Sequence, residues 1–206
     1  HMKKFLKRAN RGLILAAAAA AGVAVFTLAD NAGFSKDKPE LEALTRQYLE
    51  KVKKVNLAAP ADRSALAKAL INDYWCDTGE GYSMNGALKD EMLDYIENYQ
   101  DSASVTDYVD VERSLNVEKN GFRSAKATVE YDVSMEMDPL SREYQILGLE
   151  SGYYYYGDLT GTAEQAQDGS SAGTVNKNLT VNLYFYEKDG EWKLGTADAA
   201  NREMEG

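Results

Sequence analysis

The chain has 206 residues with 33 acidic and 23 basic side chains, and its formal net charge is −10. The acidic surplus argues against nucleic acid and anionic lipid headgroups as partners, because both require a basic surface. The one cysteine, Cys76, excludes an internal disulfide, and we expect it to be buried and inert. Because the one histidine is His1, histidine-based catalysis and histidine metal ligation are excluded as well.

The first 29 residues are predicted to be an export segment. Five basic residues stand in the first eleven positions, and residues 13–29 carry no charge. This order predicts that the chain after Asp30 lies outside the cytoplasm, and all 33 acidic residues lie from Asp30 onward. The first two residues, His1-Met2, have the form of a cloning scar.

Two forms of the export segment remain open. The segment is either a signal peptide cleaved after Ala29 or an uncleaved membrane anchor. As a helix, residues 12–29 would be about 27 Å long, which is marginal for crossing a bilayer. Residues 30–37 are expected to be a linker, and a single extracytoplasmic α+β domain is expected over 38–200, with a tail at 201–206.

Three helices are expected next, because apolar side chains recur three and four residues apart. The first runs from Lys38 to Leu57 with a capping box at its start, the second from an Asp62 cap to about Trp75, and the third begins at Asn85. Their apolar faces are formed by Leu41, Leu44, Tyr48, Val52 and Val55, by Leu66, Leu70, Ile71 and Tyr74, and by Leu88, Met92, Tyr95, Ile96 and Tyr99.

After Gln100 the apolar residues alternate with polar ones, which predicts two long strands. Inward positions of the first strand are Val105, Val109, Val111, Leu115 and Val117, and Asp107 and Arg113 are polar exceptions on the same face. The second strand has its apolar residues at odd numbers from 125 to 137. The apolar residues of both strands have odd numbers, so they lie on the same face only if the numbers of paired residues add up to an even number. A two-residue turn would give an odd sum. We therefore predict a three-residue loop with Gly121 in the left-handed conformation and a bulge.

A second hairpin is predicted near the carboxyl end. A tight type I′ turn at Asp189-Gly190 would pair Lys188 with Glu191, Phe185 with Leu194 and Leu183 with Thr196. Between the hairpins, residues 142–149 and 153–156 have strand-like composition. The stretch 157–173 is rich in small and polar residues and is expected to be a mobile insertion.

The order of helices before long strands, closed by the hairpin Lys188-Asp189-Gly190-Glu191-Trp192-Lys193-Leu194, resembles the nuclear transport factor 2-like cone fold. The resemblance covers about Lys38 to Ala197. It implies an α+β fold: an N-terminal hydrophobic helix, then three helices packed on a long, curved antiparallel sheet of four to six strands, with a pocket at the wide end. A membrane-anchored form is similar to the assembly-scaffold subunits of type IV secretion and conjugation machines.

Tyrosines form the first candidate site. Tyrosine is enriched at protein interfaces and can stack on sugar rings, so an exposed cluster would bind an envelope protein or a glycan. The candidate surface consists of Tyr153, Tyr154, Tyr155, Tyr156, Tyr184 and Tyr186. The other interpretation is that these tyrosines simply favour strands, with half of them pointing inward.

The second candidate site is a pocket containing Asp107, Arg113 or Tyr131. Ketosteroid isomerase-like enzymes of the resembling superfamily use an aspartate base with a tyrosine donor, which Asp107 and Tyr131 could imitate. The predicted register sets Tyr131 opposite Val111, about 13 Å from Asp107. Asp107 and Arg113 could equally lie at sheet ends near solvent. We expect no catalytic residue, cofactor or metal.

The expected function is therefore an extracytoplasmic, non-enzymatic binding or assembly module of a bacterial cell envelope, within a secretion- or conjugation-type machine. One alternative is a small-ligand-binding or isomerase-like pocket protein of the same fold. Another is a surface filament subunit. The expected partners are an envelope protein or glycan, the membrane if the first segment stays attached, and no nucleic acid; formation of a homo-oligomer is left open.

Overall fold

The structure is a computed structural model that describes residues 11–77, 89–90, 92–94, 96–97, 104–138, 143–150, 153–158 and 173–195. The chain divides into two compact units, His1–Pro39 and Glu40–Gly206. The second unit contains helices and an antiparallel sheet, which confirms the expected α+β class.

The first helix, α2, runs from Arg11–Leu57 without interruption. The predicted start at Lys38 is therefore wrong, and residues 30–37, the expected linker, are helical. Alanine has the highest helix propensity, and Pro39, placed inside the helix, does not end it. Within the described part of the chain, no helix combines the length and the apolar character needed to cross a membrane.

The second helix, α3, spans Pro60–Tyr74. Ala59 is its N-cap and makes no side-chain bond, so Asp62 lies in the first turn instead of capping it. Proline is tolerated in a first turn because its missing N–H would have no helical partner there. Leu70, Ile71 and Tyr74 are buried as predicted, whereas Leu66 is 46% exposed.

The buried faces of the helices follow the predicted periodicity elsewhere. Leu41, Tyr48, Val52 and Val55 of α2 are buried. The described residues between 89 and 97 are helical, and Met92 and Ile96 are buried. The side chains of Leu88, Tyr95 and Tyr99 lie outside the described residues. Cys76 is buried, as expected.

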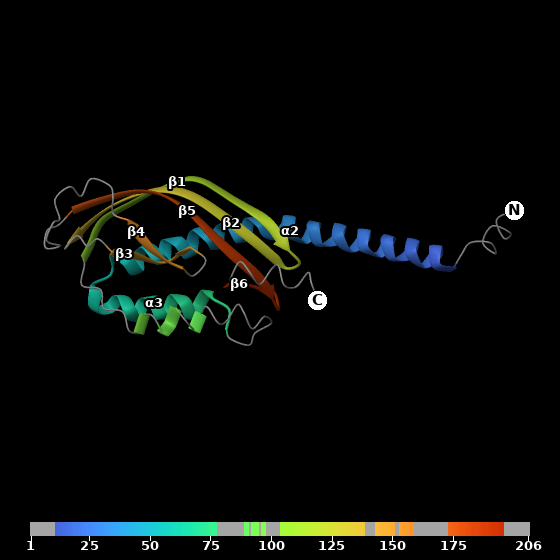
Figure 1. Cartoon of the computed structure of the whole chain (residues 1–206), viewed down its shortest axis with the longest axis horizontal. Coiled ribbons are helices and arrows are strands. Elements are labelled where there is room, and N and C mark those ends of the chain that lie inside the picture. Colours follow the sequence, from blue (N-terminus) through green and yellow to red (C-terminus); the bar gives the residue numbers. More distant parts are fainter. Residues whose placement is uncertain are drawn as a thin grey trace. The chain divides into compact units, whose positions relative to one another are not determined.

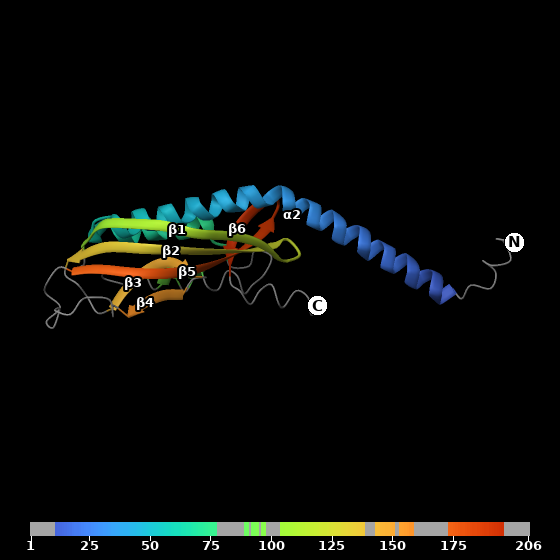
Figure 2. The same cartoon turned by 90° about the horizontal axis from the view of Figure 1, so that it is seen from above.

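The main sheet has four antiparallel strands in the order β1-β2-β5-β6. They span Ser104–Gly121, Ser124–Asp138, Gly173–Lys188 and Glu191–Gly195. Strands β3 (Glu143–Glu150) and β4 (Tyr153–Asp158) pair with each other, at the two segments with strand-like composition. In the second unit, α2 and α3 lie on one face of the main sheet (Figures 1 and 2). Most of the predicted insertion at 157–173 lies outside the described residues.

Near the turn between β1 and β2, the numbers of paired residues add up to even numbers, as predicted. Leu115 faces Val129 and Val117 faces Ala127, both even sums, and a bulge separates Lys119 from Gly121. Gly121 has a positive φ of 136°, but the turn itself is formed by Phe122 and Arg123, with φ 48° at Arg123. The bulge is confirmed, and the predicted three-residue loop is corrected to a two-residue turn.

Two further bulges in β1 were not predicted. Register shifts lie between Thr106 and Val109 and between Glu112 and Ser114. Each extra residue reverses the face on which the following residues lie. Between these two bulges, the even-numbered residues of β1 therefore point toward the helices. Tyr108 is therefore buried, whereas Val109 and Val111, predicted to face inward, are each 57% exposed.

The hairpin between β5 and β6 forms as predicted. Lys188 pairs with Glu191 and Phe185 with Leu194. Asp189 and Gly190 have φ values of 54° and 82°, and a type I′ turn requires positive φ at both central residues. The predicted partner of Leu183, Thr196, lies outside the described residues.

Candidate functional site

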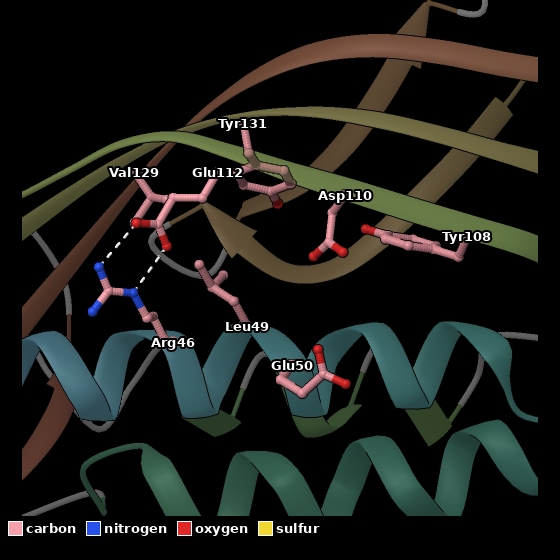
Figure 3. A pocket seen from close by; sticks show the side chains of 8 residues that line it. All are labelled: Arg46, Leu49, Glu50, Tyr108, Asp110, Glu112, Val129 and Tyr131. Atoms are coloured by element: carbon pink, nitrogen blue, oxygen red, sulfur yellow. Dashed lines mark hydrogen bonds and ion pairs between the residues drawn. The ribbon is translucent and has the colours of Figure 1, made fainter.

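A hollow of about 200 Å³ lies between α2 and the strands β1 and β2. Figure 3 shows the side chains that surround it. They come from one helix and two strands: Arg46, Leu49 and Glu50 on α2, Tyr108, Asp110 and Glu112 on β1, and Val129 and Tyr131 on β2.

The two unpredicted bulges create this site. Tyr108, Asp110 and Glu112 are the even-numbered residues between the bulges, and an unbroken strand would have turned all three to the outer face. The register shift at the first bulge also places Glu112, rather than Val111, opposite Tyr131. A polar wall thus faces α2 where the sequence pattern predicts valines.

Two ion pairs tie α2 to this wall. The Arg46 guanidinium donates two hydrogen bonds to the Glu112 carboxylate, at 3.0 and 2.9 Å (Figure 3). Lys53 Nζ lies 2.7 Å from Asp110 Oδ1. The hydrogen bonds from Arg46, together with its charge, hold the pKa of Glu112 below its ordinary value. Glu112 is therefore charged at neutral pH, and both carboxylates have a cationic partner.

Two tyrosines line the hollow beneath the charged groups. Tyr108 is 8% exposed and Tyr131 is 5% exposed. Burial raises the pKa of Tyr108, and the negative charges of Asp110 and Glu50 raise it further. Its hydroxyl consequently stays protonated. Lys53 Nζ stands 5.6 Å from the centre of the Tyr108 ring, within the range of a cation–π contact.

Glu50 completes the rim and differs from the other two carboxylates. No ion pair of Glu50 is found among the described residues, whereas Asp110 and Glu112 each have a cation. Figure 3 shows the carboxylate of Glu50, from α2, and that of Asp110, from β1, on opposite sides of the same opening. The rim therefore carries three carboxylates against two cations, a local surplus of negative charge.

The structure separates the three residues of the predicted pocket. Only Tyr131 lines the hollow. Asp107 is exposed at the first bulge with φ 51°, and Arg113, the extra residue of the second bulge, is exposed and pairs with Asp132 at 3.2 Å. A polar exception on the apolar face thus marks each of the two unpredicted bulges. That signal in the sequence could have revealed the inward turn of Tyr108, Asp110 and Glu112.

The predicted tyrosine surface is not an exposed cluster in its described part. Tyr186 is 5% exposed and Tyr184 packs against it, so the expectation that Tyr186 faces solvent is wrong. Tyr184 is half-buried, with Lys126 Nζ 5.9 Å from its ring centre. Tyr153, Tyr154, Tyr155 and Tyr156 belong to β4, and their side chains lie outside the described residues.

Among the residues described, no group of three or more histidine, cysteine or acidic side chains is arranged to hold a metal ion. Comparison with protein-family models, curated proteins and solved structures finds no match to this chain.

Proposed function

We propose that this chain is an extracytoplasmic, non-enzymatic binding module whose ligand enters the hollow between α2, β1 and β2. The observation that carries the proposal is the lining of the hollow. Tyr108 and Tyr131, each more than nine-tenths buried, lie there beside the apolar side chains of Leu49 and Val129, with charged groups at the rim. Binding sites are typically concave, with apolar and aromatic side chains and a few polar groups that orient the ligand.

The charges of the site support binding rather than catalysis. A general base works best with a pKa near neutrality, but Arg46 lowers the pKa of Glu112 instead. Asp110 is engaged by Lys53. The raised pKa of Tyr108 keeps its hydroxyl a neutral donor and acceptor rather than a base. These groups can orient a ligand, and none of them is tuned to move a proton.

The proposal also includes the fold family of the domain and its cellular location. We take the domain to be a nuclear transport factor 2-like cone, supported by helices that precede long antiparallel strands and by the closing Asp189-Gly190 turn. The basic start followed by an uncharged run supports an envelope location, with the domain outside the cytoplasm. In this setting the module would serve assembly in a secretion- or conjugation-type machine.

One observation favours a second candidate, an assembly surface on the outer face of β1. Val109 and Val111 are each 57% exposed there, and β1 is an edge strand. Exposed apolar groups beside a polar rim mark many protein interfaces. A photo-crosslinking residue at Val111 would then capture a defined envelope protein, whereas the same residue at Leu66 on α3 would not.

Filling the hollow tests the primary proposal. The full chain is titrated with a panel of anionic, neutral and cationic small molecules, each followed by calorimetry and by the NMR signals of the Tyr108 ring. We expect at least one class to bind, and Leu49→Trp to abolish the binding because the larger side chain occupies the hollow. Leu66→Trp, the same change at an exposed leucine of α3, serves as the matched control.

Two results would contradict the proposal. One is that no member of the panel shifts the Tyr108 signals. The other is that Leu49→Trp and Leu66→Trp bind the panel equally well while both remain folded by circular dichroism.

A further inference from the structure

We propose that the hollow binds a primary alkylammonium group, the chemistry shared by free aliphatic amines and lysine side chains. This inference rests on the proposed binding function and specifies its ligand class. Three observations support it: the position of the Lys53 ammonium, the negative charge of Glu50, unpaired among the described residues, and the volume of the hollow.

Lys53 shows that this wall accommodates an alkylammonium. Its Nζ is 2.7 Å from Asp110 Oδ1 and 5.6 Å from the centre of the Tyr108 ring. A carboxylate on one side and an aromatic face on the other are the two recognition elements that proteins use for amines. The same wall therefore has the chemistry for a second ammonium.

Glu50 and the Tyr108 hydroxyl are the groups that can bind this second ammonium. Glu50 approaches the opening from α2 and has no ion pair among the described residues. The hydroxyl oxygen of Tyr108 can accept a hydrogen bond from an ammonium, and its raised pKa keeps it neutral. An anionic ligand would face three carboxylates, while Arg46, the nearest guanidinium, is already bound twice by Glu112.

The size and apolar lining of the hollow define the rest of the ligand. Sites for drug-sized molecules measure about 300–1,000 Å³, so a hollow of about 200 Å³ limits the ligand to a fragment of side-chain size. Leu49 and Val129 supply apolar surface beside the charged groups. A short methylene chain fits this lining, as the stems of lysine side chains do elsewhere.

The net charge of the chain acts in the same direction. All 33 acidic residues lie from Asp30 onward, where 18 of the 23 basic residues are found. The potential of such a body raises the local concentration of cations and speeds their association. Free amines and basic peptides are both attracted in this way.

The test compares amines with neutral molecules of the same shape. The full chain is titrated with 1,4-diaminobutane and with 1,4-butanediol, and separately with N-acetyl-lysine amide and N-acetyl-norleucine amide. We expect binding by at least one amine, with its neutral counterpart at least about tenfold weaker, and weaker amine binding at higher salt. Comparison of the two amines distinguishes a free amine from a side chain as the source.

Substitutions then assign the binding to the hollow. Glu50→Gln and Tyr108→Phe should each weaken amine binding by about fivefold. Glu40→Gln makes the same charge change on an exposed residue of α2 about 15 Å along the helix and should leave the affinity unchanged. Circular dichroism confirms that each variant is folded.

The outcomes separate this inference from the proposed function. The inference is overturned if neither amine binds, if the neutral counterparts bind equally well, or if Glu50→Gln has no more effect than Glu40→Gln. Binding of a neutral or anionic molecule that Leu49→Trp abolishes would leave the proposed function intact and overturn only the alkylammonium assignment.

Discussion

The indole N–H of Trp75 donates a hydrogen bond of 3.2 Å to the hydroxyl of Tyr48. Both side chains are almost completely buried. Tyr48 comes from α2, and Trp75 directly follows α3. The next residue, Cys76, donates its backbone N–H to the carbonyl of Leu194 in β6 at 2.9 Å. One short segment thus joins both helices to the last strand of the sheet.

Tyr48→Phe tests this connection. The change removes the acceptor and leaves the Trp75 N–H without this partner in an apolar interior, so we expect a loss of about 1–2 kcal/mol of unfolding free energy. Urea titration followed by tryptophan fluorescence measures it. Tyr184→Phe removes a hydroxyl from a half-buried tyrosine and should change the stability by less than about 0.5 kcal/mol. Equal stability of the two variants would contradict the prediction.

The first bulge of β1 supplies a second prediction, at Asp107. Its φ of 51° lies in the left-handed region, which aspartate and asparagine tolerate better than most residues with a Cβ and which β-branched residues tolerate least. Asp107→Val should therefore destabilise the fold by about 1–2 kcal/mol, whereas Asp107→Gly should be within about 1 kcal/mol of the parent.

The same two substitutions at Thr106, an exposed neighbour without a positive φ, provide the control. There the order of stability should reverse, because valine favours a strand more than glycine does. Thermal unfolding followed by circular dichroism ranks the four variants. The bulge geometry is contradicted if valine is the better residue at both positions.

These bulges also explain which part of the molecule follows from the sequence. The hairpin at Asp189-Gly190 was predicted to the residue, because a two-residue turn sets the whole register of the strands beside it. The inward orientation of Tyr108 was not predicted. One extra residue at Asp107 exchanges the two faces of the strand after it without changing the composition of the strand. The candidate site depends on that reversal, so a reading based on strict alternation assigns its polar wall to the outer face.

The helices show the complementary limit. Periodicity correctly identified the buried residues Tyr48 and Val52, because it reports which face of a helix is apolar. The helix α2 begins at Arg11, 27 residues or about seven turns before the predicted start. The prediction failed because Asp37 and Glu40 fit a capping box, although Asp37 is itself helical. A local capping signal is weak beside an alanine-rich segment that continues the helix.

Lys89 and Asp77 form an ion pair that gives a third prediction. Lys89 is 5% exposed, and its ammonium contacts the Asp77 carboxylate and the Trp75 carbonyl. Asp77→Asn would leave a buried ammonium without its counter-charge, so we expect a loss of about 1–2 kcal/mol at neutral pH. The double variant Asp77→Asn with Lys89→Met should recover most of that loss, because the unpaired charge is gone. Failure of the second change to restore stability would contradict this account.

The pH dependence of stability provides a fourth prediction from the same pair. The hydrogen bond from Lys89 is the main cause that lowers the pKa of Asp77. A carboxyl group whose pKa is lower in the folded state stabilises the fold above its unfolded pKa of about 3.9 and loses that contribution as the pH falls. The stability difference between the parent and Asp77→Asn should therefore be constant near neutrality and shrink below about pH 4. Urea titrations from pH 7 downward measure it, and a difference that grows in acid would contradict the sign.

The last prediction concerns attachment to the membrane. Ala29, the residue before the candidate cleavage point, lies inside α2, and helical backbone is a poorer substrate for proteolysis than an exposed loop. For a domain exported as proposed above, we therefore expect the first segment to be retained. An alkaline phosphatase reporter fused to the carboxyl end should be active, because this enzyme requires the environment outside the cytoplasm, and deletion of residues 13–29 should abolish its activity. The exported fusion should keep its full mass and remain with the membranes after alkaline washing. A product shortened by about 29 residues in the soluble envelope fraction would instead identify a signal peptide, and an inactive reporter would contradict export altogether.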